Sequence, residues 1–591
     1  MPLYPRFRPQ PTEQLLTESF GGYDHRLRIP EGSWYDTRNL TTDQAPLLAP
    51  RPPRGLTGRR ALALLEKDAL CYVGTDGTLY YNWLPTGLTG LSPGEKQLVG
   101  LGAYICVFPD RVYLNTEDLS DYGSMEASFA ASALYRLCRA DGAEVEAART
   151  PSAPAAPANG DYWIDALSSR PVLRQWSEAQ QDWVAVESAC VKISFSSPGV
   201  SAAFRAWDGV EISGSSVEGL NGEKLLRAVG EDWVLVEGLL ESAPSAPERV
   251  AITRAVPRLD FVCECRNRLW GCRFGLGEDG RVLNEICCSA LGDFRNWRQF
   301  RGLSTDSWAA SVGSDGPWTG AVSFLGCPTF FKENRIHRVE VSPEGAHRID
   351  ETVCRGVQKG SASSLAVVNE TLYYKSPADV CAWQGGFPRG ISEALGPGES
   401  YGAAAAGAAG GKYYLSMLDS AGAPQLFVYD TARELWMRED DARFTAFARA
   451  NGALFALGAD GEIAVLLGAL PSLEGARTEE SFTWAAVSAP ESRAYPENRR
   501  LSRYNLRLKL ERGASLRVYL RYDALPAGAD GPFDEGWTCA GGIDAAGELE
   551  GHFVLPVRPR RCDHLQMAVV GTGGAQLCSI ARLLETGSDY R

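Results

Sequence analysis

The chain has 591 residues, of which 45% are hydrophobic and 22% charged, a balance typical of folded proteins rather than disordered ones. At roughly 100–200 residues per domain, this length predicts about two to four domains. The formal net charge of −14 argues against a protein that coats nucleic acid through a basic face. We find no apolar run near the ~18 residues of a membrane-spanning helix and no apolar signal core, so we expect neither membrane insertion nor export.

Residues 1–56 are rich in proline and arginine and show no hydrophobic periodicity. We therefore predict an extended arm that lies on its own chain or on a neighbouring molecule. From residue 57 to 140 the pattern changes to short β-rich runs separated by tight turns, such as the Gly-Thr-Asp-Gly turn at 74–77. An Asp-Gly pair between such runs is a strong hairpin signal.

The same hairpin pattern returns over residues 256–470, at 329–331, 365–374, 412–429 and 453–466. Short strands in hairpins at this spacing predict the blades of a β-propeller, and an irregular pair of β-sandwiches is the alternative. Tyr429 and Trp436 resemble a kelch-type blade end, in which the tryptophan fills the gap between two blades. The fold class we expect is therefore all-β, with a propeller at its centre.

Two further modules are predicted outside the propeller. Residues 141–255 begin with a Pro/Ala-rich linker and continue as strand-rich sequence, which indicates a small β-barrel or sandwich inserted between blades. After a polar linker at 471–500, residues 501–591 alternate apolar and polar side chains with period two, which predicts a C-terminal β-sandwich. Residues 481–591 contain 14 basic and 13 acidic residues, so the acidity belongs to residues 1–480.

Several clusters could carry chemistry, and each has a plainer structural interpretation. Five cysteines lie close together (Cys263, Cys265, Cys272, Cys287 and Cys288), but their spacing favours buried thiols over a zinc site. The acidic run Glu439-Asp440-Asp441 is interpreted as a solvated turn, and Ser314–Trp318 has the letters of a sialidase box at the wrong spacing. We find no common catalytic motif, so we expect no enzyme, no catalytic or metal-binding residue, no disulfide and no cofactor.

The most informative segment lies between residues 266 and 300 and contains Asn267, Arg268, Leu269, Ser289, Gly292, Asp293, Phe294, Asn296 and Trp297. These residues resemble a motif of the tail-nozzle (tail tubular B-type) proteins of short-tailed bacteriophages, with Trp297 where that family usually has phenylalanine. The family's arm motif is matched loosely by Gly21, Gly22, Asn39 and Arg51, whereas the ending at Arg54 departs from it. The chain also resembles virion proteins of phages and prophages of gut Firmicutes.

The resemblance implies a structural protein of a phage virion that forms a homo-oligomeric ring, six-fold in that family, at the end of the tail. Its expected partners are further copies of itself, neighbouring tail or adaptor proteins, and passing DNA that it does not read by sequence. The motif residues are expected to hold a propeller corner, and the arm to contact a neighbouring subunit. A tail-tip adhesin for a surface glycan or protein, and a glycan-cleaving propeller enzyme, are the alternatives.

Overall fold

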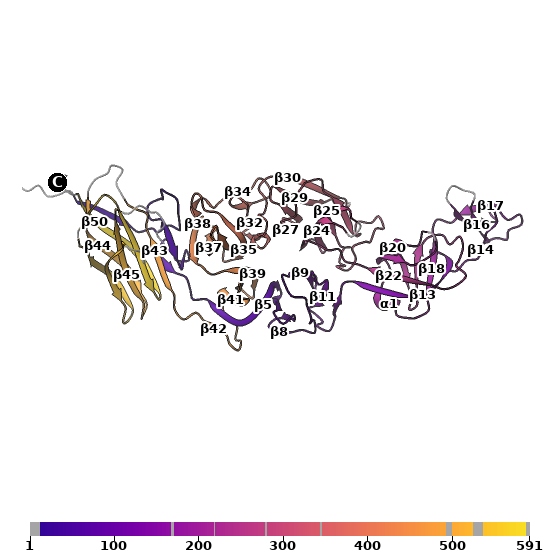
Figure 1. The fold of residues 1–591 in the computed structure, drawn as a ribbon, viewed down its shortest axis with the longest axis horizontal. Coiled ribbons are helices and arrows are strands. Elements are labelled where there is room, and N and C mark those ends of the chain that lie inside the picture. The colour runs from indigo at the N-terminus through magenta and orange to yellow at the C-terminus, as the bar shows by residue number, and fades with distance from the viewer. Residues whose placement is uncertain are drawn as a thin grey trace, which may run out of the picture.

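The structure is a computed structural model that describes residues 12–166, 171–217, 219–277, 280–342, 345–491, 499–523, 536–558 and 560–586. The first 11 residues of the arm and the middle of the turn at 277–280 lie outside these ranges. The described chain is all-β and consists of a sandwich, a propeller and a barrel in a row (Figure 1). Its helices are limited, within the described ranges, to α1 (Val200–Ala203) and the 3-10 turns η1 (Ala362–Ser364) and η2 (Glu393–Leu395).

The propeller occupies the middle of the molecule, and its sheets form seven blades within the described residues. Five blades are separate four-stranded sheets, and one longer sheet supplies the other two. The five are β9–β12 (Gln97–Leu101, Tyr104–Phe108, Val112–Asn115, Tyr122–Ser124), β23–β26 (Phe261–Glu264, Leu269–Leu276, Val282–Cys288, Trp308–Ser311), β27–β30 (Gly320–Phe324, Cys327–Lys332, Arg335–Val341, His347–Val353), β31–β34 (Ala366–Val368, Thr371–Lys375, Val380–Trp383, Arg389–Gly390) and β35–β38 (Tyr401–Ala409, Lys412–Asp419, Pro424–Asp430, Leu435–Asp440).

The long strand β5 (Gly55–Lys67) closes the ring of blades. Its second half pairs with β6 to begin the first blade, and its first half pairs with β41 to complete the last. The first blade continues through β6 (Ala69–Gly74), β7 (Leu79–Tyr81) and β8 (Leu84–Pro85), and the last contains β39 (Phe444–Ala450), β40 (Ala453–Gly458) and β41 (Glu462–Leu467). One strand thus joins the first and last blades, and it removes two exposed sheet edges.

The inserted module is a closed barrel between the second and third blades. Its strands are β13 (Ala127–Arg139), β18 (Ala189–Phe195), β21 (Trp233–Glu237), β20 (Gly222–Val229), β19 (Gly209–Ser213) and β22 (Glu248–Arg254). A small sheet at the far end holds β14 (Ala147–Ala148), β15 (Tyr162–Asp165), β16 (Val172–Ser177) and β17 (Asp182–Ala185). The insertion begins at residue 127 rather than 141, because β13 precedes the Pro/Ala-rich segment and alternates buried and exposed residues like any barrel strand.

The sandwich at the other end consists of two five-stranded sheets. One sheet contains β1 (Thr12–Thr17), β50 (Ala575–Thr586), β44 (Arg499–Leu510), β47 (Leu549–Pro556) and β48 (Arg561–Cys562). The other contains β2 (Asp36–Arg38), β43 (Thr483–Val487), β49 (Leu565–Thr572), β45 (Ser515–Tyr522) and β46 (Thr538–Asp544). The described part of the arm is therefore folded onto its own chain, because β1 pairs with β50 and β2 with β43.

Two small elements connect the sandwich to the propeller. The ribbon of β3 (Leu40–Thr41) and β4 (Ala49–Pro50) lies beside β38, and β42 (Arg477–Thr478) pairs with β5. Within the described ranges, no helix is long and apolar enough to span a membrane.

Candidate functional site

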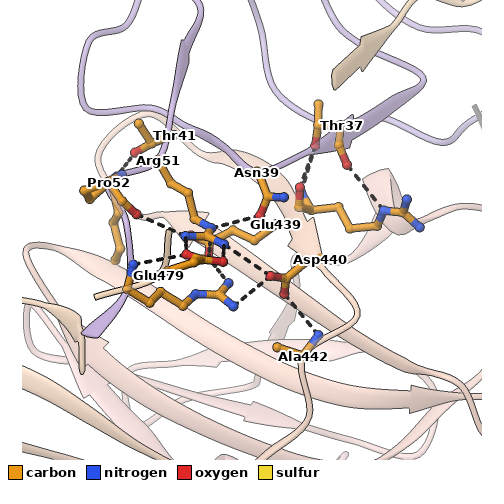
Figure 2. Close-up of polar contacts among 12 residues, drawn as sticks. Thr37, Asn39, Thr41, Arg51, Pro52, Glu439, Asp440, Ala442 and Glu479 are labelled. Carbon is orange, nitrogen blue, oxygen red and sulfur yellow. Dashed lines mark hydrogen bonds and ion pairs between the residues drawn. The ribbon is translucent and has the colours of Figure 1, made fainter. Parts of the chain in front are cut away.

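The predicted motif residues gather at two junctions, one on each side of the propeller. The junction with the sandwich contains Asn39, Arg51, Arg54, Glu439, Asp440 and Glu479, and we call this set the arm joint. Figure 2 shows five of these side chains converging: Asn39 and Arg51 from the arm, Glu439 and Asp440 from the end of β38, and Glu479 from the segment that follows β42. The arm joint thus connects three segments that are far apart in the sequence.

Each arginine of the arm joint donates to at least two side-chain oxygen atoms. Arg51 Nη1 lies 2.7 Å from Glu479 Oε2, and its Nε donates to Asn39 Oδ1 at 2.8 Å. Arg54 donates to Asp440 and Glu439, each at 2.7 Å. The two arginine side chains are only 3% and 9% exposed, so these pairs are held in a low-dielectric interior. Arg51 also stacks on the ring of Phe482, 4.1 Å from its centroid.

Two acidic members of the arm joint, Asp440 and Glu479, are held as carboxylates. Burial by itself would raise the pKa of Asp440, but Arg54 and Arg51 hold that pKa below its usual range. Burial likewise raises the pKa of Glu479, but the hydrogen bond and charge of Arg51 lower it, and the resulting pKa is below the usual range. Sequence reasoning missed this role, because Glu439 and Asp440 were interpreted as a solvated turn. Glu439 is buried, Asp440 is half-buried, and only Asp441 of that run is exposed. The available signal was a pair of arginines three residues apart that lacked acidic partners nearby in sequence.

The glycine pair of the arm contacts the blade-end tryptophan. Tyr23 N donates to the carbonyl oxygen of Trp436, and a Cβ atom built on Gly22 would lie 2.4 Å from that same oxygen. Only glycine therefore allows the arm to approach the blade this closely. Gly21 N donates to Gly32 O within the arm. Trp436 is buried, its ring centroid lies 4.8 Å from that of Tyr429, and its Nε1 donates to Ile391 O at 2.8 Å in the preceding blade.

The second junction lies between the third blade and the barrel. The buried Asn296 Oδ1 accepts a hydrogen bond from Gly209 N at 3.1 Å, and Asn296 Nδ2 donates to Trp207 O at 3.0 Å. Phe294 packs between the rings of Tyr104 and Tyr113, at 4.9 and 5.0 Å. We call this junction the barrel joint. It is formed by Asn267, Arg268, Ser289, Gly292, Phe294, Asn296 and Trp297. It connects the third blade with both the second blade and the barrel.

The remaining motif residues shape the loop that carries Phe294 and Asn296. Arg268 is buried and donates to the carbonyl oxygens of Ser289, Ser304 and Asp306. Leu269 N donates to Ser289 Oγ.

The turn of the same loop begins at Gly292, which has φ = +72° and donates to Asn267 O. Trp297 is buried with Phe294 and donates to its carbonyl oxygen at 2.9 Å. The main chain of Asp293 belongs to the same turn, since its N donates to Ala290 O and its O accepts from Asn296 N, and its side chain accepts from Arg295 N.

A serine, a histidine and a glutamate also meet inside the propeller, between the third and fourth blades. Ser314 Oγ lies 3.0 Å and Glu351 Oε2 lies 3.4 Å from His337, but both approach the same ring nitrogen, Nε2. A hydrolytic triad needs the base to contact the acid through its other nitrogen. Burial, ahead of nearby charges, lowers the pKa of His337 to about 4. His337 is fully buried, so this cluster is a structural contact rather than an accessible reaction centre.

The cysteines between residues 263 and 288 are free and buried. Burial raises the pKa of Cys287 to about 12 and that of Cys288 to about 11, so both are thiols at neutral pH. Among the described residues, no group of three or more His, Cys, Asp or Glu side chains is arranged to hold a metal ion.

Comparison with known proteins gives no assignment by sequence, because no family model and no curated protein matches the chain. The solved structures that match part of the chain include three of low similarity. A bifunctional GH43-CE protein of Bacteroides eggerthii is 9% identical over 56% of this chain and 62% of its own, with a TM-score of 0.19. The acylaminoacyl peptidase of Pyrococcus horikoshii is 11% identical over 55% and 57%, with a TM-score of 0.20. A GH43 glycoside hydrolase engineered for both endo-xylanase and exo-arabinofuranosidase activity is 10% identical over 55% and 97%, with a TM-score of 0.19.

These similar structures correct one expectation from the sequence. The chain was predicted not to be an enzyme, and the similar structures are named as enzymes, so that prediction is overturned and is not carried further. The chain spans less than two thirds of the length of the first two of these proteins. TM-scores this low assign neither a reaction nor active-site residues.

Proposed function

We propose that the chain is a structural protein of a bacteriophage tail, and that several copies form a ring around the path of the exiting DNA. The observation that supports this proposal best is the attachment of the sandwich and the barrel to opposite ends of the propeller through buried joints (Figure 1). The wall of a channel under mechanical load needs subunits whose parts keep their relative positions. Buried and hydrogen-bonded joints meet that need, because opening them would expose unpaired polar groups.

A second observation concerns the propeller face that would line the channel. In six of the blades an acidic residue lies in the turn between the second and third strands or, for Asp419, at the strand end that opens this turn, and equivalent turns of a propeller lie on the same face. These residues are Asp76, Asp110, Glu333, Asp379, Asp419 and Asp460. We propose that this face borders the DNA, because like charge disfavours lasting contacts with phosphates.

Native mass spectrometry and negative-stain electron microscopy of the purified protein test the ring. We expect a particle several times the mass of one chain, with a central opening. The rings should also fail to retain duplex DNA at physiological salt. A protein that is monomeric at every concentration tested, or a ring that binds duplex DNA tightly, would contradict the proposal.

A further inference from the structure

A cavity of about 330 Å³ lies at the side of the sandwich, where the arm crosses its edge. Its apolar wall is formed by Leu15, Phe20, Ile29, Met567 and Ile580. The volume falls in the range of sites that hold small organic molecules. None of the residues of the arm joint or the barrel joint lines it, so the cavity is separate from both.

Three residues that line this cavity each carry a buried hydrogen-bond donor without a partner. Trp34 Nε1, Arg499 Nε and Arg582 Nε are buried, and the structure gives them no partner among the residues it describes. The three residues are only 3%, 6% and 6% exposed. Buried donors in native proteins are nearly always paired, so three unpaired donors on one cavity indicate a missing acceptor.

The other groups at the cavity hold both arginines in place. Arg582 Nη1 pairs with the carboxylate of Glu491, and its Nη2 donates to Thr17 Oγ1 at 3.0 Å. Arg499 Nη2 donates to the carbonyl oxygen of Glu491. The interior thus contains two cations and one carboxylate, and Glu31, 4.0 Å from Arg582, lies at the exposed rim. The charge left inside the cavity is one positive charge.

We propose that the cavity binds a small carboxylate with an apolar body. A single negative charge matches the surplus positive charge, and the carboxylate oxygens accept from the free Nε–H of the arginines and from the indole N–H. The hydrocarbon part covers the apolar wall. An uncharged ligand would leave the cationic donors without a charged acceptor, and an inorganic anion would leave the wall uncovered. This inference does not rest on ring formation.

Calorimetric titration of the full chain with hexanoate tests the site, with hexan-1-ol and acetate as matched probes. Hexan-1-ol lacks the charge and acetate lacks the apolar body, so we expect hexanoate to bind at least about tenfold more tightly than either. Absence of hexanoate binding, or equal affinity for hexanoate and hexan-1-ol, would overturn the proposal.

A conservative substitution separates binding from folding. Trp34→Phe removes an N–H that has no partner in the empty cavity and keeps a ring that packs on Phe20. We expect a thermal midpoint lowered no more than by the Trp484→Phe control below, and an affinity for hexanoate that falls about tenfold. Trp484→Phe is the control, because Trp484 lies in the same sandwich and its Nε1 already donates to Gly573 O. An affinity that Trp34→Phe leaves unchanged, or that Trp484→Phe lowers equally, would refute the role of Trp34.

Discussion

The two joints hold the propeller by different chemistry. In the arm joint, two buried arginines are matched by three carboxylates, so each charge depends on the others. In the barrel joint, an asparagine side chain bonds main-chain atoms and aromatic rings fill the space between the elements. A buried charge that loses its partner costs far more than a neutral group that does so. The arm joint should therefore respond to pH and to charge deletion, and the barrel joint to lost packing.

Removal of one arginine from the arm joint should have the largest effect. Arg54→Met leaves Glu439 and Asp440 buried with less compensation, and we expect a loss of about 3–5 kcal/mol in the free energy of unfolding. Urea unfolding followed by tryptophan fluorescence measures it. Arg389→Met is the matched control, because Arg389 is 64% exposed and its pair with Glu434 lies at the surface. The control should change stability by less than about 1 kcal/mol. Equal effects of the two substitutions would show that the arm joint is not a stabilising contact.

Truncation of the aromatic anchor should have a comparable effect at the other joint. Trp297→Ala empties a buried site packed with Phe294, and we expect a cost of about 3–5 kcal/mol. Phe387→Ala is a suitable control, because Phe387 is 81% exposed. A thermal midpoint unchanged by Trp297→Ala would rule out an anchoring role, and loss of binding to cells or glycans without loss of stability would favour the adhesin.

A smaller effect should follow from Asn296→Ala. The substitution removes the side-chain bonds to Gly209 and Trp207 and leaves two buried main-chain groups unpaired, at a cost of about 1–3 kcal/mol. Because these bonds connect the barrel to the third blade, hydrogen exchange should rise at Trp207 and Gly209 but not in the sandwich. Faster exchange throughout the chain would instead indicate general destabilisation.

The sequence predicted the fold where local patterning determines it. Hairpin turns and period-two alternation indicated the propeller and the sandwich, and both are present. What it could not predict depends on contacts between distant segments. Strand β5 divides its pairing between β41 and β6, which are far apart in sequence, so the ring closure left no local pattern. Glu439 and Asp440 have the sequence of an ordinary acidic turn. Their partner Arg54 lies 385 and 386 residues away in the sequence, so no local pattern indicates the contact.

A fall in pH should change the stability contributed by the arm joint but not that contributed by the barrel joint. The pKa values of Asp440 and Glu479 are lowered in the folded chain, because Arg54 and Arg51 outweigh the effect of burial. A carboxyl group whose folded pKa is lowered stabilises the fold at a pH above its unfolded pKa, and this contribution is lost as the pH falls through the folded pKa.

The stabilisation that Arg54 provides through Asp440 is therefore present at pH 7. It is lost as the pH falls below the ordinary pKa of Asp, about 4, toward the lowered pKa of the folded chain. The difference in unfolding free energy between the parent and Arg54→Met should narrow as the pH falls from 7 to 3. The difference between the parent and Asn296→Ala should stay constant, because Asn296 and its partners do not titrate. Urea unfolding of the three proteins at both pH values measures the two differences. If both differences in unfolding free energy narrow equally, the acid response arises elsewhere in the chain. If neither difference narrows, the carboxylates of the arm joint stay charged at pH 3.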